Sequence, residues 1–106
     1  MRLVPLRGEI WLVDLGPIIK TRPVLVISTG HDDQERAIIG YVPRTTKIRG
    51  TRHEVPHQGR GFDPGVFDVQ GVASAPAVHY LRRLSVVDGA TLARVEDALR
   101  SWLGLE

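Results

Sequence analysis

The heptapeptide EIWLVDL at residues 9–15 has the strict alternation that is typical of a β-strand. Trp11, Val13 and Leu15 share one face of the extended backbone, and the residues between them share the other. Gly16 and Pro17 follow directly as a turn signal. We therefore expect a strand over residues 9–15 that ends in a turn.

Five further segments are predicted strands, because each is short, mostly apolar or β-branched, and bounded by turn residues. They comprise residues 24–28, 37–42, 51–56, 66–69 and 79–84. Pro43 is expected to end the strand 37–42, since proline has no N–H to donate to a sheet. Charges within residues 51–56 indicate an edge strand, and the small residues of segment 71–77 leave that segment unassigned.

The periodicity changes near the end of the chain, where apolar residues recur at the spacing of a helix. These residues are Leu92, Val95, Leu99, Trp102 and Leu103. Asp88 is a suitable N-cap and Gly104 a suitable stop. We expect this helix to pack its apolar stripe, with Trp102 in the core, against the sheet.

Short strands followed by one helix predict a mainly β, α+β fold that curls into a small sheet or barrel. The order of elements leaves an SH3-like barrel, an OB-fold and a plain α+β sheet open. The chain has 106 residues, so we expect one domain over residues 1–106. With 42% hydrophobic and 25% charged residues, the composition is that of a soluble globular domain.

The chain has no cysteine, which excludes disulfides and thiolate metal sites. This composition fits a reducing cytoplasm, where we expect the protein to act. No apolar run is long enough to cross a bilayer, so no membrane association is expected. The four histidines lack metal-ligand spacing, and we expect neither a metal nor another cofactor.

Basic side chains gather in one segment of a chain whose formal net charge is only +2. Between positions 44 and 60, Glu54 is the one acid, and the basic residues are Arg44, Lys47, Arg49, Arg52 and Arg60. Such a segment is either a solvated loop or a surface that binds phosphates. Charge alone does not decide between these two interpretations.

Four segments, in this order, resemble the MazF/PemK family of toxins. RGEIWLVDLGP at residues 7–17 resembles its opening strand, and TRPVLVIST at 21–29 resembles a second strand that is entered through an Arg-Pro pair. VPRTTKIRGTRHEVP at 42–56 resembles the segment in which Thr-Thr follows a strand-ending proline. LRRLSVVDGATLARVEDALRSWLGL at 81–105 resembles the closing strand and helix. The resemblance rests on the four motifs together and on their order.

The resemblance implies an SH3-like barrel with a C-terminal helix, usually a homodimer. It implies the toxin of a type II toxin–antitoxin system, an endoribonuclease that cuts single-stranded mRNA to a 2′,3′-cyclic phosphate and a 5′-hydroxyl. It also implies a cognate, MazE-like antitoxin whose acidic and apolar tail occupies the RNA groove. The alternatives are a non-catalytic SH3-like module that binds RNA or a partner protein and, more remotely, a DNA-binding module.

Two catalytic residues follow from the resemblance. Arg22, in the Arg-Pro pair, matches the family's catalytic arginine, and Thr45, first of the Thr-Thr pair, matches its catalytic threonine. Arginine can donate two parallel hydrogen bonds to a phosphate, and threonine can donate a hydroxyl to it. Without the resemblance, Arg22 paired with Asp14 and Thr45 as an ordinary strand residue would be the default interpretations.

Further candidates come from chemistry and position. His53 and Glu54 are candidate general bases, because arginine, with a pKa above about 12, is a poor one. The candidates for further catalytic or RNA-binding contacts are Thr46, Asp68 and Gln70, the last two sharing one face of a predicted strand. The candidates for contacts with the RNA backbone are Arg44, Lys47, Arg49 and Arg52.

The link between the first two strands departs from the family pattern. Relatives usually have a longer loop there that covers the RNA groove. In this chain only residues 18–21 separate Pro17 from Arg22. We expect the shorter link to leave the groove more open, to alter the sequence that is cut, or to weaken activity.

Overall fold

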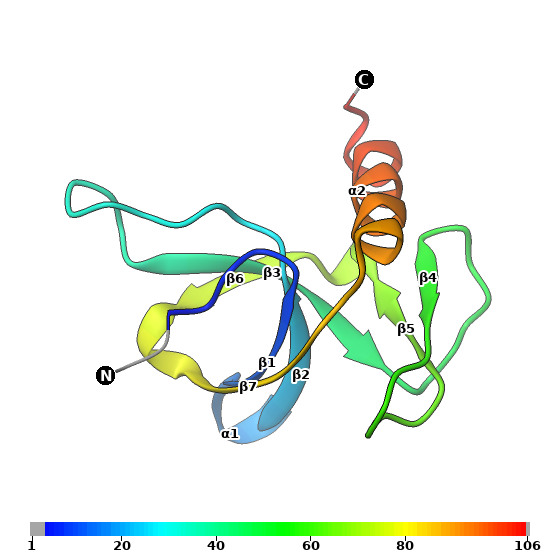
Figure 1. Ribbon diagram of the computed structural model, residues 1–106, viewed down its shortest axis with the longest axis horizontal. Coiled ribbons are helices and arrows are strands. Elements are labelled where there is room, and N and C mark those ends of the chain that lie inside the picture. Colours follow the sequence, from blue (N-terminus) through cyan, green and yellow to red (C-terminus); the bar gives the residue numbers. More distant parts are fainter. Residues whose placement is uncertain (1–3, 106) are drawn as a thin grey trace.

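The computed structural model describes residues 4–105 and shows a curled antiparallel sheet with one long helix (Figure 1). The strands are β1 (Glu9–Asp14), β2 (Thr21–Val26), β3 (Ile38–Thr45), β4 (Glu54–His57), β5 (Gly65–Asp68), β6 (Ala73–Pro76) and β7 (Tyr80–Val86). The helical elements are α1 (Gly16–Ile19), α2 (Gly89–Leu103) and the short 3₁₀ turns η1 (Val69–Gly71) and η2 (Ala77–His79).

The strand β3 organises the sheet. The strand order is β4-β5-β3-β2-β1-β7, and β6 pairs with β3 beside this path. On the edge of β3 away from β2, the first half pairs with β6 and the last two residues pair with β5. Figure 1 shows β3 crossing the molecule between these two groups of strands. The expected mainly β fold with a C-terminal helix is confirmed, and the sheet is barrel-like.

The alternation of the strands divides the core into two clusters on opposite faces of the sheet. The cluster inside the curl contains Trp11, Val13, Val24, Val26, Ile39, Tyr41, Ala75 and Tyr80. The cluster under α2 contains Ile10, Leu25, Val42, Val55, Phe67, Val69 and Val95. Trp11 is thus a packing residue, as its place in the first strand predicts, and its indole N–H donates to Glu9.

The predicted strands exist, with ends that shift by a few residues. The expectation that Pro43 ends the third strand is wrong, because β3 continues to Thr45. Pro43 lies where one edge of β3 changes its partner from β6 to β5, after Tyr41 and before Arg44. A proline is tolerated at such a break, where no ladder hydrogen bond is required of its nitrogen. Residues 73–76 of the unassigned segment form β6.

The helix α2 has the predicted caps. The Asp88 side chain accepts a hydrogen bond from the Thr91 N–H at 2.7 Å, and Gly104 ends the helix in a left-handed conformation. Trp102, however, is 41% exposed and not a core residue. The last turn of α2 projects away from the sheet in Figure 1, so its apolar side chains have little to pack against. Within residues 4–105, no helix has the length and apolar character needed to cross a bilayer.

Candidate functional site

The pairing of β2 with β3 brings Arg22 and Thr45 together. These strands are antiparallel, with Val24 opposite Pro43. Continuing the same register by two residues sets Arg22 opposite Thr45, on the same face of the sheet. The paired residues of the two strands end at Val24 and Pro43, and Arg22 and Thr45 lie just beyond them.

An open hollow of about 360 Å³ lies at this point, and we call it the threonine hollow. It is lined by Arg22, Pro23, Arg44, Thr45 and Thr46. Arg22 is exposed, and the one hydrogen bond of its guanidinium within the described residues goes to the Thr21 carbonyl at 2.9 Å. The Thr45 hydroxyl oxygen accepts the Lys47 N–H at 3.0 Å, which leaves its own proton free to be donated.

A second hollow of about 300 Å³ adjoins the first, and we call it the tyrosine hollow. It is lined by Leu15, Ile19, Arg22, Tyr41, Pro43, Arg44, Thr45 and Gly71. Ile19 and Tyr41 are not among the site residues predicted from the sequence. The signal for Tyr41 was present, since Tyr41, Pro43 and Thr45 are two residues apart and so share one face of a strand.

Arg44 contributes to the lining of both hollows, but its guanidinium lies against β4 and the loop before β5, and the residue is only 5% exposed. Its Nε donates to His57 Nδ1 at 2.8 Å, and its Nη2 donates to the carbonyls of His57 and Asp63. The guanidinium carbon also lies 4.8 Å from the centre of the Phe62 ring. Two of the three guanidinium nitrogens thus donate inside the protein, which leaves Arg44 poorly placed for the RNA-backbone contact expected from the sequence.

Burial is the largest cause of the pKa shifts in this cluster. Burial lowers the pKa of Arg44, and the charge of Asp63 partly opposes that effect. Burial and the neighbouring Arg44 charge also lower the pKa of His57, against a smaller opposing contribution from Asp88. A neutral His57 can accept from Arg44, as the observed hydrogen bond requires.

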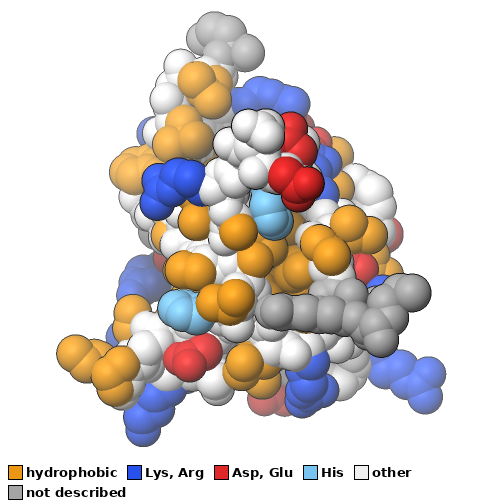
Figure 2. Space-filling view, turned by 90° about the vertical axis from the view of Figure 1, so that its left-hand side faces the viewer, with side chains coloured by type: hydrophobic (Ala, Val, Ile, Leu, Met, Phe, Trp, Pro, Cys, Tyr) orange, Lys and Arg blue, Asp and Glu red, His pale blue; other side chains and the backbone are white. Residues whose placement is uncertain are grey.

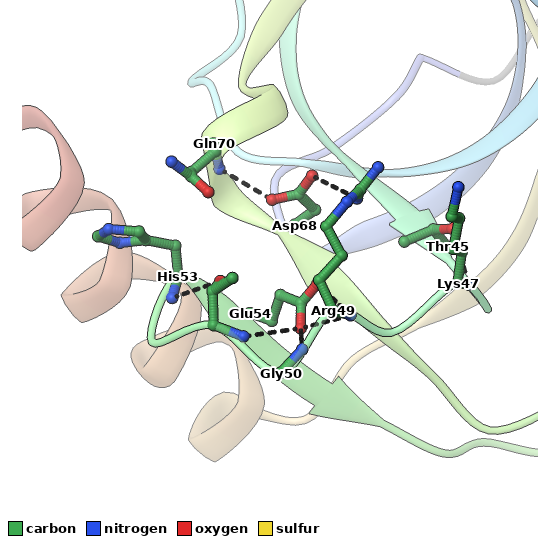
Figure 3. Close-up of polar contacts among 9 residues, drawn as sticks. Thr45, Lys47, Arg49, Gly50, His53, Glu54, Asp68 and Gln70 are labelled. Carbon is green, nitrogen blue, oxygen red and sulfur yellow. Dashed lines mark hydrogen bonds and ion pairs between the residues drawn. The ribbon is translucent and has the colours of Figure 1, made fainter.

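Glu54 organises the loop before β4 (Figure 3). Its carboxylate accepts the backbone N–H groups of Arg49, Gly50 and Thr51 at 2.7–3.3 Å. Desolvation raises the pKa of Glu54, but these three donors and the Arg49 charge outweigh it, and the net pKa is lowered. The Arg49 guanidinium lies 3.9 Å from the carboxylate of Asp68. Glu54 therefore has a structural role in the loop, and it does not line either hollow.

Asp68 and Gln70 do not share a strand face, contrary to expectation. β5 ends at Asp68, whose side chain caps η1 by accepting the Gln70 N–H at 3.2 Å. Gln70 lies in that 3₁₀ turn with an exposed side chain, and neither residue lines either hollow. Lys47 and Arg52 are exposed on the loop between β3 and β4, beside the threonine-bearing end of β3.

His53 is 8% exposed and packs edge-to-face against Trp102, with ring centres 5.0 Å apart. Its buried Nδ1 has no hydrogen-bond partner within residues 4–105. The structure thus places His53 under α2, apart from the residues that line the two hollows. Across the described residues, no three His, Cys, Asp or Glu side chains gather in a group suited to a metal ion.

Comparison with known proteins identifies the family. Residues 6–103 match the family of PemK-like, MazF-like toxins of type II toxin–antitoxin systems. The chain belongs to this family.

The fold of this toxin is shared with solved structures over almost the whole chain. MazE–MazF from Deinococcus radiodurans has a TM-score of 0.84 at 23% identity and covers 99% of this chain and 100% of that one. An endoribonuclease in complex with its cognate antitoxin from Mycobacterial species has a TM-score of 0.83 at 25% identity. The match covers 96% of this chain and 97% of that one. The Mycobacterium tuberculosis toxin MazF-mt6 has a TM-score of 0.80 at 22% identity. The match covers 92% of this chain and 98% of that one.

Proposed function

We propose that this toxin is a metal-independent endoribonuclease that cuts single-stranded RNA at a phosphate held between Arg22 and Thr45. One observation carries the proposal: Arg22 and Thr45, on the neighbouring strands β2 and β3, line the same open hollow. The similarity in fold to a protein described as an endoribonuclease supports it.

In the proposed reaction the 2′-oxygen of the RNA attacks the adjacent phosphorus, and the bond from phosphorus to the 5′-oxygen breaks. The products are a 2′,3′-cyclic phosphate and a 5′-hydroxyl. Arg22 donates two hydrogen bonds to the phosphate oxygens and stabilises the charge that develops there. Thr45 donates its free hydroxyl proton to the same phosphate, which orients it for in-line attack.

Two protons must move in this reaction. None of the residues that line the threonine hollow has a side chain that ordinarily titrates near neutral pH. We infer that solvent accepts the proton of the 2′-hydroxyl and supplies the proton of the leaving 5′-oxygen. His53 and Glu54 take no part, because one packs under α2 and the other caps a loop.

We further propose that the toxin acts in the cytoplasm as a homodimer and is inhibited by a cognate antitoxin with an acidic and apolar tail. Two of the solved relatives are toxin–antitoxin complexes. Exposed hydrophobic residues near η2 and along β7 support an interface between two copies; they are Val78, Leu81 and Val86. Figure 2 shows hydrophobic side chains at the surface on the side of the molecule that carries η2.

Incubation of the purified protein with a long single-stranded RNA in EDTA tests the nuclease proposal. We expect discrete fragments with 5′-hydroxyl ends, and we expect Arg22→Ala to abolish them. Binding of the RNA without fragments would instead identify a non-catalytic module. A preference for duplex DNA would identify a DNA-binding module, and either result would overturn the proposal.

A further inference from the structure

The tyrosine hollow has no role in the proposed reaction so far, although it adjoins the threonine hollow directly. The two hollows share Arg22, Arg44 and Thr45 in their linings. A phosphate bound by Arg22 and Thr45 therefore lies at the entrance to the tyrosine hollow. In RNA, each base is one ribose away from the phosphate, so an adjoining base can reach this hollow.

The hydroxyl of Tyr41 supplies a polar group in this hollow. The chain has two tyrosines, and the hydroxyl of Tyr80 donates to the Ile39 carbonyl at 2.9 Å. Tyr41 is 8% exposed, and its hydroxyl has no hydrogen-bond partner within residues 4–105. Burial raises the pKa of Tyr41, so the phenol stays neutral and can both donate and accept. The Tyr41 hydroxyl is not among the buried unpartnered atoms of the described residues, so it is open to the hollow and available to a polar ligand atom.

The walls of the hollow are apolar and firmly held. Ile19, which is 52% exposed, lines it from α1, and Pro43 lines it from β3. The α1 turn is closed by two backbone hydrogen bonds, from Leu15 N–H to the Lys20 carbonyl and from Lys20 N–H to the Gly16 carbonyl. Lys20 has φ 68° and ψ −153°, a conformation that almost only glycine adopts. The fold therefore holds Ile19 in place at the expense of local strain.

We propose that the tyrosine hollow binds one of the two nucleobases that flank the scissile phosphate, with Tyr41 hydrogen-bonded to the base edge and Ile19 packed against the base face. The inference rests on the proposed nuclease function and makes Tyr41 and Ile19 specificity-determining residues. Unstacked bases of single-stranded RNA are read in this way, through their edges and their flat faces. The short link between β1 and β2 thus forms one wall of the substrate site.

The first test maps the cut sites of the wild type and of Tyr41→Phe on one long single-stranded transcript, by sequencing the 5′-hydroxyl ends. The substitution removes only the hydroxyl. We expect the preference for the favoured base beside the cut to fall roughly tenfold, the worth of one hydrogen bond. Tyr80→Phe is the matched control, because its hydroxyl is bound within the core; it should lower thermal stability and leave the base preference unchanged.

The second test compares Ile19→Ala with Ile18→Ala. The two isoleucines are neighbours, but Ile18 is 91% exposed and does not line the hollow. We expect Ile19→Ala to weaken binding of a short RNA, made uncleavable by one 2′-deoxy nucleotide at the mapped cut, by about five- to tenfold. Ile18→Ala should bind this RNA like the wild type.

The outcomes separate this inference from the nuclease proposal. A wild type that cuts RNA, with Tyr41→Phe retaining the same base preference or Ile19→Ala binding like Ile18→Ala, would overturn the inference alone. Unchanged RNA cleavage and binding with weaker inhibition by an antitoxin peptide would also overturn it, and would assign the hollow to that peptide. A wild type that neither cuts nor binds RNA would overturn both.

Discussion

Arg44 and Thr45 are neighbours in β3 and differ in almost every structural respect. Arg44 is buried, and its guanidinium is bound by His57 and Asp63 on the side of the sheet that faces β4 and β5. Thr45 faces the other side, where it lines an open hollow with the exposed Arg22. One arginine therefore stabilises the sheet, and the other is available to a ligand.

This difference follows from the two-residue period of a strand, which sends successive side chains to opposite faces. A count of basic residues in a segment ignores the period and so overestimates the surface that can bind phosphate. Arg44 should be removed from that count, and Arg49 is turned toward Asp68. We therefore expect replacement of Arg22 to lower activity and replacement of Arg44 to lower stability.

The largest effect is expected for Arg22→Ala. The substitution removes the guanidinium proposed to stabilise the phosphorane, so single-turnover cleavage should fall by about 100- to 1000-fold. The melting temperature should stay within a few degrees of the wild type, because Arg22 is exposed and bonded only to the adjacent carbonyl. A matched loss of activity and stability would show that Arg22 is structural, like Arg44.

Arg44→Ala should have the opposite profile. It removes three hydrogen bonds and leaves His57 Nδ1 and the Asp63 carbonyl without their donor. We therefore expect the free energy of unfolding, measured in urea, to fall by about 2–4 kcal/mol. The folded fraction should still bind RNA. A fully stable Arg44→Ala protein that has lost RNA binding would reverse the assignments of the two faces.

The Arg44 cluster should also make stability depend on pH. His57 has a lowered pKa in the folded protein, so the unfolded chain binds more protons and stability falls as the pH drops below about 6.5. Chemical denaturation between about pH 7 and about pH 5 measures this slope, in a window above the usual carboxylate range. We expect His57→Phe to flatten it. An unchanged slope in this variant would mean that His57 is already free to take up a proton.

The smallest effects are expected for His53→Gln and Glu54→Gln, measured as initial rates of RNA cleavage. His53 packs beneath Trp102 and Glu54 binds backbone N–H groups, so we expect rates within about twofold of the wild type at a temperature where each variant is folded. Abolished cleavage with intact RNA binding in either variant would make that residue the general base.

The sequence predicts the elements of this fold well where one pattern dominates. The alternation of residues 9–15 and the helical spacing after Asp88 correspond to β1 and α2. The sequence does not predict the features that depend on tertiary structure. The tolerance of Pro43 depends on which strands lie beside β3, and the exposure of Trp102 depends on where the sheet ends under α2.

The candidate site follows the same division. The predicted roles of Arg22 and Thr45 came from a resemblance, but that both line one hollow depends on the pairing of two strands. The register could not be read from the residues before the pairing was known. The tyrosine hollow depends further on Gly71, where an added Cβ would lie 2.8 Å from the Pro43 ring, a contact between segments far apart in the chain.

The central claim is that Arg22 and Thr45 act on one phosphate, and a double-mutant cycle tests it most directly. Single-turnover cleavage of a short RNA in EDTA would be measured for the wild type, Arg22→Ala, Thr45→Val and the double variant. Groups that act as a unit on one transition state are non-additive, so the double variant should be little slower than Arg22→Ala alone. Losses that multiply in the double variant would mean that the two side chains act independently, and would contradict the account.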